Sequence, residues 1–541
     1  MTISHFLYII NRITVYNLEN VQEEKFEEAI MTGNTLGWVI VAFVLYLLMM
    51  IAIGAFYAKG NNNSEDYFLG GRKLNGFVAA LSAQASDMSG WLLMGLPGAI
   101  YLTGVGGDGW IAIGLFIGTT LNWLFIATKL RRYTIRANNS VTLPTYFENR
   151  FHDEKKVLMT VSSITIVVFF LVYCASALSA GGQLFESVFG IDYHVALTIG
   201  ALVVLVYTFL GGFTAVCVTD FIQGMLMLVG ILAVPLFAYH FLTTGGTTLS
   251  AGLEASGADS ANFLNLMKNG DGSNNIVSVI SGLGWGLGYF GMPHILVRFM
   301  AVRDEKEMTK SKATAISWVA LSLGFAVFIG ILGRAYLPEL VNGNNEKVFI
   351  EMIKKVFTVE MRAPFIAGLF LCGILAAIMS TADSQLLVSA SSVAEDIFKG
   401  LLKKDADDKT VMNVSRVTVL VVAVLAYIIA WNPNNTVMGL VSNAWAGLGA
   451  AFGPLVVMSL YWKRTNFPGA VAGIVTGALA VIIWDYIPLV GGQTLGKATG
   501  LYSLIVGFGL GLIAIIAVSL ATKAPSEEML QEFEDVKANR L

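Results

Sequence analysis

One apolar stretch of the chain, residues 75–103, carries a carboxylate near its middle. The central seven residues combine this carboxylate with two hydroxyls and a glycine, and they read Ala85-Ser86-Asp87-Met88-Ser89-Gly90-Trp91. A charge at membrane depth is costly unless it faces a cavity or a partner. Serine and glycine allow a helix to unwind there, which frees carbonyl oxygens for a hard cation such as sodium and exposes a half-helix N-terminus to an anionic group. The alternative is that Asp87 lies at a helix end and meets water.

A second apolar stretch, residues 276–300, is rich in glycine and aromatic residues. Its centre holds four glycines and a proline within ten residues, and it reads Gly284-Trp285-Gly286-Leu287-Gly288-Tyr289-Phe290-Gly291-Met292-Pro293. This composition predicts an interrupted helix. Irregular backbone at membrane depth must lie against protein or a cavity, and the aromatic residues are suited to enclosing a small substrate. The alternative is ordinary helix packing through small residues.

A third apolar stretch, residues 363–394, contains two adjacent hydroxyls, Ser380 and Thr381, followed by Asp383. Each hydroxyl can supply an oxygen ligand to a cation. The competing interpretation is that both hydroxyls bond back to carbonyls of their own helix. Asp383 adds a carboxylate that either extends an ion pathway or pairs with another helix.

Four further features leave alternatives open. Tyr173 lies in the middle of an apolar stretch, where tyrosine usually has a packing role. Asp220 fits an interfacial and a buried position equally well, and the histidine at 294 is more typical of a structural residue than of a proton relay. Residues 491–497 read like a phosphate-binding loop, but Ala498 replaces the required hydroxyl and no strand is predicted before them, so we expect no nucleotide site.

The elements that position these residues are predicted to be membrane-spanning helices. Of the 541 residues, 55% are hydrophobic and only 13% are charged, with a net charge of −3, which gives no support for a nucleic-acid partner. At about 17 to 25 apolar residues per span, we predict about thirteen spans in an all-α polytopic membrane protein. They lie near 35–58, 75–103, 109–130, 157–187, 193–210, 215–242, 276–300, 312–337, 363–394, 412–431, 436–461, 467–487 and 500–522.

Lysine and arginine predict the orientation of these spans. They concentrate in one set of alternate loops, with the segment 338–362 as the exception, which places the N-terminus outside and the C-terminus in the cytoplasm. Residues 1–34 are predicted to form a polar extension, unless translation starts at Met31. Residues 35–522 form the transporter domain, and residues 523–541 form a cytoplasmic tail.

The two interrupted stretches are five spans apart. Matching interruptions in two halves are typical of an inverted-repeat transporter with its binding site at the bilayer midplane. The spacing therefore predicts two five-helix repeats, with broken helices 2 and 7 and a repeat core at about 75–461.

At these residues the chain resembles the sodium/solute symporter family, from about residue 35 to the tail. The pattern Asp66-Tyr67-Phe68-Leu69-Gly70-Gly71-Arg72 is similar to that of the wider family. Residues 83–97, 143–147, 285–300 and 441–454 extend the resemblance, and the first and third of these point to the branch that carries proline. The resemblance implies a LeuT-like fold of five plus five helices with flanking spans.

The resemblance also implies roles for individual residues. A sodium site would take backbone carbonyls from Ala85, Met88 and Ala377 and hydroxyls from Ser380 and Thr381. The substrate would be contacted by Ser89, Gly90, Trp91, Tyr173, Trp285, Tyr289 and Pro293. Coupling would involve Asp87, Arg72 at the cytoplasmic side, Asp220 and Asp383.

By this resemblance the chain is expected to be a multi-pass protein of the bacterial inner membrane that takes up L-proline together with sodium. The alternatives are another small solute, such as a sugar, pantothenate or another amino acid, or a transporter-like membrane sensor. We expect no enzyme activity, because no catalytic constellation is evident in the sequence.

Overall fold

The computed structural model describes residues 33–58, 64–208 and 212–540. The predicted extension 1–34 and the possible start at Met31 therefore lie almost entirely outside the described residues. Helices account for nearly all regular structure in the described ranges, together with one antiparallel hairpin of β1 (Pro488–Val490) and β2 (Gln493–Thr494). Apart from their ends, helices satisfy their backbone hydrogen bonds internally, which a chain surrounded by lipid requires.

The first half of the bundle follows an edge helix, α2 (Gly33–Ala58). Its main elements are α4 (Gly76–Asp87), η2 (Trp91–Gly95), α5 (Leu96–Thr103), α6 (Val105–Leu121), η3 (Asn122–Ile126), α7 (Ala127–Arg136), α9 (Val157–Phe189), α10 (Tyr193–Thr208) and α11 (Phe213–Thr244). Short connecting elements are α3 (Ser64–Leu69), η1 (Gly70–Arg72), α8 (Leu143–Arg150), α12 (Leu249–Ala255) and α13 (Ser260–Phe263).

The second half has the same kind of elements. They are α14 (Ile276–Gly284), η4 (Trp285–Gly291), α15 (Pro293–Ala301), α16 (Glu305–Tyr336), α18 (Pro364–Ser391), η8 (Ser392–Leu402), α19 (Asp408–Ala430) and α20 (Val437–Tyr461), followed by the flanking helices α21 (Phe467–Tyr486) and α23 (Ser503–Ala521). The connecting elements are η5 (Pro338–Asn342), η6 (Asn345–Lys347), α17 (Val348–Lys354), η7 (Lys355–Glu360), α22 (Leu495–Thr499) and α24 (Glu527–Lys537).

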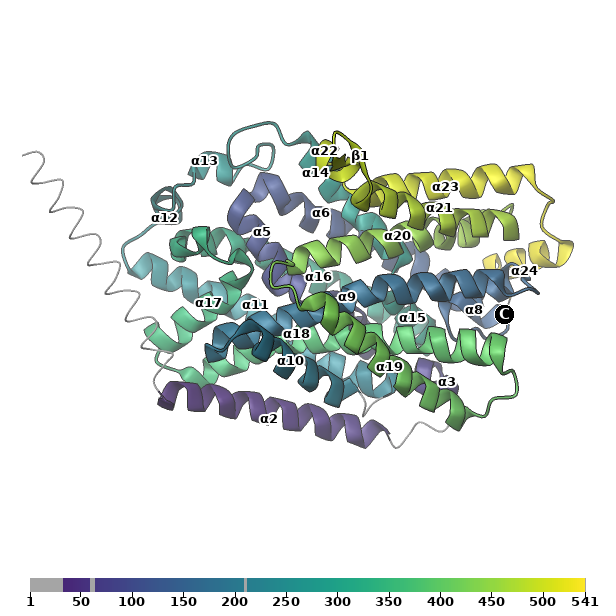
Figure 1. The fold of residues 1–541 in the computed structure, drawn as a ribbon, viewed down its shortest axis with the longest axis horizontal. Coiled ribbons are helices and arrows are strands. Elements are labelled where there is room, and N and C mark those ends of the chain that lie inside the picture. Colours follow the sequence, from purple (N-terminus) through teal and green to yellow (C-terminus); the bar gives the residue numbers. More distant parts are fainter. Residues whose placement is uncertain (1–32, 59–63, 209–211, 541) are drawn as a thin grey trace, which may run out of the picture.

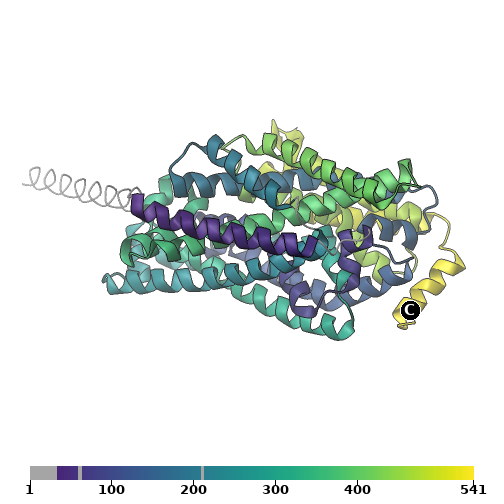
Figure 2. The same ribbon diagram turned by 90° about the horizontal axis from the view of Figure 1, so that it is seen from below.

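The helices run side by side along the long axis of the molecule, with α2 at one edge and α21 and α23 toward the other (Figures 1 and 2). In the most apolar window of α20, 83% of residues are buried, and 78% in that of α18 with η8, against 33% for the first helix and 28% for α23. The core of the bundle therefore lies around α18 and α20, and the flanking helices face outward.

Each of the thirteen predicted spans overlaps a helix or a pair of helices in the structure. Within the described ranges, ten helices are long and apolar enough to cross a membrane, or eleven if the bent pair 276–291 and 293–301 counts as one span. The apolar helices 91–103 and 193–206 fall short of that length. The polytopic all-α fold is confirmed, and the count of thirteen stays a prediction.

Both predicted interruptions are confirmed. The first span stops at Met88, whose φ of −80° and ψ of 72° leave the helical region, and it resumes at η2. The second passes through the 3₁₀ segment η4, becomes extended at Met292 and bends by 48°. Gly286 also packs against Gly114 and Gly118 of α6, so small-residue packing operates in this stretch alongside the break.

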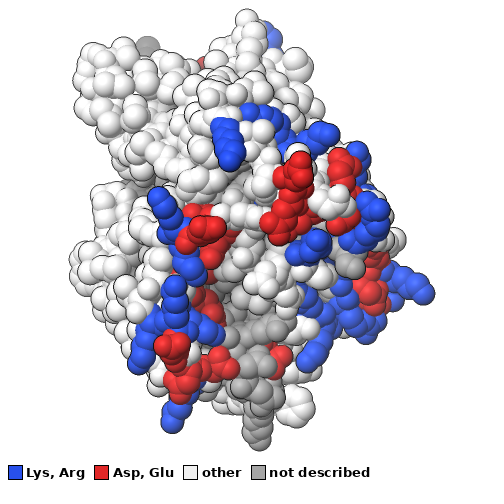
Figure 3. Space-filling view, turned by 90° about the vertical axis from the view of Figure 1, so that its right-hand side faces the viewer, with Lys and Arg blue, Asp and Glu red and all other residues white. Residues whose placement is uncertain are grey.

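One end of the molecule gathers charged side chains of both signs, with many lysines and arginines (Figure 3). The C-terminal helix α24 lies at this end, with Met529, Phe533 and Val536 buried against the bundle. Asp535 of this helix pairs with Arg136 at 3.7 Å. The predicted tail 523–541 is thus docked on the bundle.

Two lysines of the exceptional loop 338–362 form ion pairs with carboxylates. Lys347 pairs with Glu186 at 2.7 Å, and Lys354 pairs with Glu351 at 2.9 Å. The two carboxylates neutralise the charges of Lys347 and Lys354, which are among the basic residues that make this loop an exception to the alternation of Lys and Arg between loops.

Candidate functional site

The end of α4 presents a backbone carbonyl to two hydroxyls of α18. The last carbonyls of a helix lack intrahelical partners, and the Ala85 oxygen accepts hydrogen bonds from Ser380 Oγ at 2.8 Å and Thr381 Oγ1 at 3.4 Å. Ser380 Oγ also lies 3.3 Å from the carbonyl oxygen of Ala377. The structure therefore brings four of the five predicted cation ligands into one buried cluster.

This cluster offers only oxygen atoms. Carbonyl and hydroxyl oxygens are the ligands that hard cations prefer. Met88, the fifth predicted ligand, is fully buried at the residue where the helix breaks. The hydroxyls of Ser380 and Thr381 donate to a carbonyl of a neighbouring helix. They therefore differ from hydroxyls that bond only to carbonyls of their own helix, which was the competing interpretation.

The Asp87 side chain links the two broken spans. It is fully buried, and its Oδ2 accepts a hydrogen bond of 2.6 Å from the Tyr289 hydroxyl. Asp87 thus lies at a helix end, as the alternative held, but it is buried and not exposed to solvent. The Asp87 carbonyl accepts a second set of bonds, from Trp91 Nε1 at 2.9 Å and from the Tyr173 hydroxyl at 3.5 Å. The carboxylate of Asp87 thus binds the second broken span, and its carbonyl binds side chains of η2 and α9.

The residues directly after the first break differ in what they contact. Ser89 Oγ accepts a hydrogen bond from the Trp91 amide at 3.3 Å and so closes the turn into η2. Gly90 lies against α9, because a Cβ there would be 2.7 Å from Ala180 Cβ. Gly90 thus allows close approach of the broken helix to its neighbour.

The predicted residues of the second break point in different directions. Tyr289 faces Asp87, whereas the Trp285 ring stacks on Tyr502 at 4.8 Å, and Pro293 begins α15. Trp285 and Tyr289 are held by one residue that the sequence reasoning missed, Trp445 of α20.

Trp445 donates from Nε1 to the Trp285 carbonyl at 2.9 Å, and its ring meets Tyr289 edge-on at 5.1 Å. A Cβ on Gly288 would lie 2.0 Å from Trp445 Nε1, so only glycine permits this approach. The resemblance included Trp445 within residues 441–454, but no local pattern singled it out.

Asp220 is buried, which decides between the two positions left open by the sequence. It pairs with Arg298 at 3.2 Å and accepts a 2.7 Å hydrogen bond from Ser82 Oγ. Arg298 also donates to Ser384 Oγ at 2.5 Å, and Ser384 contacts Asp383 at 3.4 Å. Arg298 was missed, although a lone arginine inside the stretch 276–300 is a sequence signal that demands a buried carboxylate.

Arg72 does not join the site at the breaks. Its guanidinium donates to the carbonyls of Met300 at 2.7 Å and Ser140 at 2.8 Å, and to side chains of Thr134 and Asn139. It therefore ties η1 to the end of α15 and to the segment after α7.

The histidine at 294 packs edge-on against the rings of Phe170 at 5.4 Å and Tyr173 at 6.0 Å. This packing fits a structural residue, but its two buried ring nitrogens have no hydrogen-bond partner among the described residues, so it is not a hydrogen-bonded one. A short strand, β1, does precede residues 491–497, so the prediction of no strand there is wrong. These residues form the turn of an antiparallel hairpin, β2 and the start of the five-residue α22, which is not the setting of a phosphate-binding loop.

Two other buried carboxylates were not singled out in the sequence. Glu346 of η6 accepts hydrogen bonds from the amides of Val437 and Met438, both at 2.9 Å, and so caps the N-terminus of α20. Asp396 of η8 lies near the opposite end of the bundle and is bonded to hydroxyls. Neither lies within a local pattern that predicts its partner.

Comparison with known proteins identifies relatives along most of the chain. The sequence profile described as "Sodium:solute symporter family" matches residues 67–477. The "Sodium/proline symporter" of Escherichia coli (strain K12) is 45% identical over 506 residues, covering 92% of this chain and 96% of the relative. The "High-affinity proline transporter PutP" of Bacillus subtilis (strain 168) is 44% identical over 488 residues, covering 90% of this chain and 98% of the relative.

A solved structure supports the fold. A sodium-coupled sialic acid symporter in a substrate-bound outward-open state matches with a TM-score of 0.72, covering 91% of this chain and 99% of the other. At 21% sequence identity this likeness concerns the fold alone, which agrees with the predicted LeuT-like architecture. The profile match and the identity to relatives establish that the chain belongs to the sodium:solute symporter family.

Proposed function

We propose that this chain is a sodium-coupled secondary active symporter that imports L-proline by alternating access. The observation that carries sodium coupling is the contact of the Ala85 carbonyl with Ser380 Oγ and Thr381 Oγ1 at the end of a broken helix. The assignment of proline is supported by the relatives named as sodium/proline symporters.

The sodium ion would replace the hydrogen bonds that now fill this cluster. Two hydroxyls point their donors at one carbonyl, and rotation of the hydroxyls would turn their lone pairs toward a cation instead. Ala85, Met88 and Ala377 would supply carbonyl oxygens, and Ser380 and Thr381 would supply hydroxyl oxygens. No formal charge is needed in the first shell if enough dipoles surround the ion.

Proline would lie beside this cluster, between the two breaks. Proline is a zwitterion with an apolar ring, so its carboxylate suits the freed helix N-terminus around Ser89 to Trp91. Its ammonium and ring suit the aromatic faces of Trp91, Tyr173 and Tyr289. Pro293 and Trp285 would form the more distant walls.

Coupling would run through residues 85–91, because in this arrangement they would touch both ligands. Sodium at the Ala85 carbonyl would fix the end of α4, and Asp87 transmits that geometry to Tyr289 through the bond between their side chains. Coupling is reciprocal, so proline must then also raise the affinity for sodium. One inward positive charge gains about 2.3 kcal/mol per 100 mV, which is more than tenfold in accumulation.

We further propose that the chain lies in the bacterial inner membrane with its C-terminus in the cytoplasm. The charged end with α24 would then face the cytoplasm, in line with the excess of lysine and arginine in its loops. Residues 35–522 would form the transporter domain, with residues 1–34 outside and 523–541 docked inside. Arg72, Asp220 and Asp383 would assist coupling by holding the inner halves of the moving helices.

The test is uptake of labelled proline into proteoliposomes that contain the purified chain. An imposed inward sodium gradient should drive accumulation, and equal sodium on both sides should give only equilibration. Accumulation without sodium would contradict sodium coupling. Counterflow against unlabelled sugars, pantothenate and other amino acids tests the substrate, since a stronger competitor than proline would replace it in the assignment.

A further inference from the structure

A buried carboxylate holds the N-terminus of α8 against the inner extension of α18. Asp396, in η8, is 1% exposed. Its Oδ1 accepts hydrogen bonds from Thr142 Oγ1 at 2.7 Å and Thr145 Oγ1 at 2.8 Å. Its Oδ2 lies 3.4 Å from Ser163 Oγ of α9. One side chain thus joins η8 to the consecutive elements α8 and α9, which lie 233 to 254 residues earlier in the chain.

The charge of Asp396 is balanced by a helix end. Thr142 is the N-cap of α8, and its hydroxyl also accepts a 3.1 Å hydrogen bond from the Thr145 amide. The positive end of α8 therefore faces the carboxylate. None of the ion pairs found among the described residues includes Asp396.

This arrangement differs from that of the buried Asp220, which forms an ion pair with Arg298. Separating a buried ion pair leaves two uncompensated charges in the protein. Separating a carboxylate from hydroxyls costs less free energy if water replaces them, because water supplies the same kind of hydrogen-bond donor. The contact at Asp396 is therefore suited to opening and closing.

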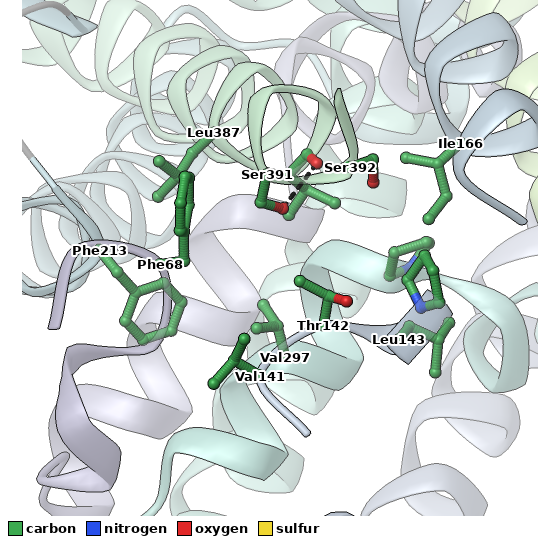
Figure 4. Close-up of a pocket in the computed structure, with 13 residues that line it drawn as sticks. Phe68, Val141, Thr142, Leu143, Ile166, Phe213, Val297, Leu387, Ser391 and Ser392 are labelled. Carbon is green, nitrogen blue, oxygen red and sulfur yellow. Dashed lines mark hydrogen bonds between the residues drawn. The ribbon is translucent and has the colours of Figure 1, made fainter. Parts of the chain in front are cut away.

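A small cavity lies beside this contact (Figure 4). Val297 and Pro293 of α15 line it together with Leu387 and Ser391 of α18, and Thr142 forms the opposite wall, below Ser391 in the view. Pro293 is the first residue after the second break, and Thr142 is a donor to Asp396. The cavity thus extends from the broken helix to the Asp396 contact.

The cavity is too small for an amino acid in this state. It holds ≈ 20 Å³ of space that the centre of a water molecule can reach, which is room for about one water. Its walls come from α15, α18 with η8, and α8 with the segment before it, and single residues of α3, α9 and α11 complete them. Widening of the cavity on the side of Asp396 requires α8 to move away from η8. Asp396 is the polar contact that opposes this movement.

We propose that Asp396 and the first turn of α8 form the cytoplasmic gate of the transport path, and that the cavity between Pro293 and Thr142 is the closed exit route. This inference rests on the proposed transport function and on the predicted orientation. In the closed state the three hydroxyls donate to Asp396. In the open state α8 has moved away, water fills the widened cavity, and the carboxylate is hydrated.

The gate is tested by the accessibility of a cysteine inside the cavity. Ser391 is the reporter site, because its hydroxyl bonds only to the Val388 carbonyl of its own helix, at 2.8 Å. The native Cys174, Cys217 and Cys372 are first replaced by alanine, and Ser391→Cys is introduced. The labelling rate by a membrane-impermeant maleimide is then measured in inside-out and right-side-out vesicles.

Asp396→Asn should raise the labelling rate about tenfold or more in inside-out vesicles, because charge-assisted hydrogen bonds to the gate are lost. The rate in right-side-out vesicles should stay low. Asp407→Asn is the matched control, since Asp407 caps the N-terminus of α19 by accepting from Thr410 N at 3.1 Å, away from the cavity. This control should label like the parent.

An unchanged labelling rate in Asp396→Asn, or an equal rise from both sides, would overturn the gate. If Asp396→Asn does not fold, Thr145→Val removes one donor from the partly buried side of the contact, and the same rise is expected. Labelling requires no solute. A failure of proline uptake together with the predicted labelling would therefore contradict the transported substrate but leave the gate intact, and the reverse result would contradict only the gate.

Discussion

The two interrupted spans of this protein are broken in different ways. The first leaves the helical conformation over Met88 and Ser89, and the backbone carbonyls freed there accept hydrogen bonds from nearby side chains. The Ala85 carbonyl accepts from two hydroxyls, and the Asp87 carbonyl accepts from Trp91 and Tyr173. The second extends over a seven-residue 3₁₀ segment, Trp285–Gly291. Side chains from other helices hold it there, through Trp445 Nε1 on the Trp285 carbonyl and Asn122 Nδ2 on the Tyr289 carbonyl at 2.9 Å.

This difference suits the two breaks to the different tasks that we propose for them. A sharp break leaves helix-end carbonyls and a new helix N-terminus close together, and this is the arrangement that we propose for the sodium site. A longer, glycine-rich break brings aromatic rings up to that point and depends on its neighbours for its shape. The bond between Asp87 and Tyr289 is where the two meet.

The largest expected effect comes from Asp87→Asn. The substitution removes a buried negative charge from the first break and weakens the bond to Tyr289, so we expect sodium-driven proline uptake to fall by about 100-fold or more. Uptake in proteoliposomes and sodium binding to purified protein are the measurements. Asp485→Asn is a suitable control, because Asp485 contacts Ser503 at 2.6 Å on the flanking helices. Normal sodium affinity in Asp87→Asn would remove this residue from coupling.

The next largest effect is expected from Ser380→Ala combined with Thr381→Ala. Loss of two oxygen ligands should raise the sodium concentration needed for half-maximal uptake by about 10- to 100-fold. The sodium dependence of proline uptake is the measurement. Ser322→Ala removes a buried hydroxyl that bonds to its own helix at Val319, and it should leave the sodium requirement unchanged. An unaltered sodium dependence in the double variant would show that the cluster holds no ion.

Tyr289→Phe tests whether the second break acts mainly on the substrate. The ring stays and only the hydroxyl that donates to Asp87 is lost, so we expect about a tenfold rise in the proline concentration for half-maximal uptake. Sodium binding without proline should change much less. If both ligands weaken equally, the division of tasks between the two breaks is wrong.

The smallest effect is expected from Trp445→Phe. One neutral hydrogen bond to the Trp285 carbonyl is lost at a cost of about 1 kcal/mol, or roughly a fivefold decrease in proline affinity if the 3₁₀ segment is held less firmly. Proline binding by isothermal titration measures it. If the sodium affinity falls more than the proline affinity, Trp445 supports the ion site at the first break and not the substrate site at the second.

The pattern of the sequence predicted both breaks because their causes are local. Glycine, serine and proline within an apolar stretch weaken a helix at the place where they occur. The charge of Asp87 marks a position at membrane depth that needs a polar partner or a cavity. The hydroxyls of Ser380 and Thr381 were equally compatible with bonds to their own helix. The structure shows that they reach Ala85, nearly 300 residues earlier in the chain.

Other parts of the site had no local signal. Trp445, Arg298 and Asp396 each find partners on helices that are distant in the sequence, and hydropathy does not identify which helices are neighbours. Trp285 was predicted to contact the substrate together with Tyr289. Because a 3₁₀ segment turns successive side chains differently from an α-helix, the two rings point apart, and the Trp285 ring stacks on Tyr502. Its contact with the substrate stays a prediction.

The sequence by itself determined that this protein is a bundle of membrane helices with two interruptions. The reason is that the free-energy cost of placing a residue in lipid depends on the type of that residue, so each apolar stretch and each exception within it is visible in the sequence. Only the tertiary structure decided which carbonyl meets which hydroxyl, which carboxylate meets an arginine, and which meets a helix end. Those pairings depend on the packing of helices against one another, and a polar group buried in lipid must find its partner wherever the fold supplies one.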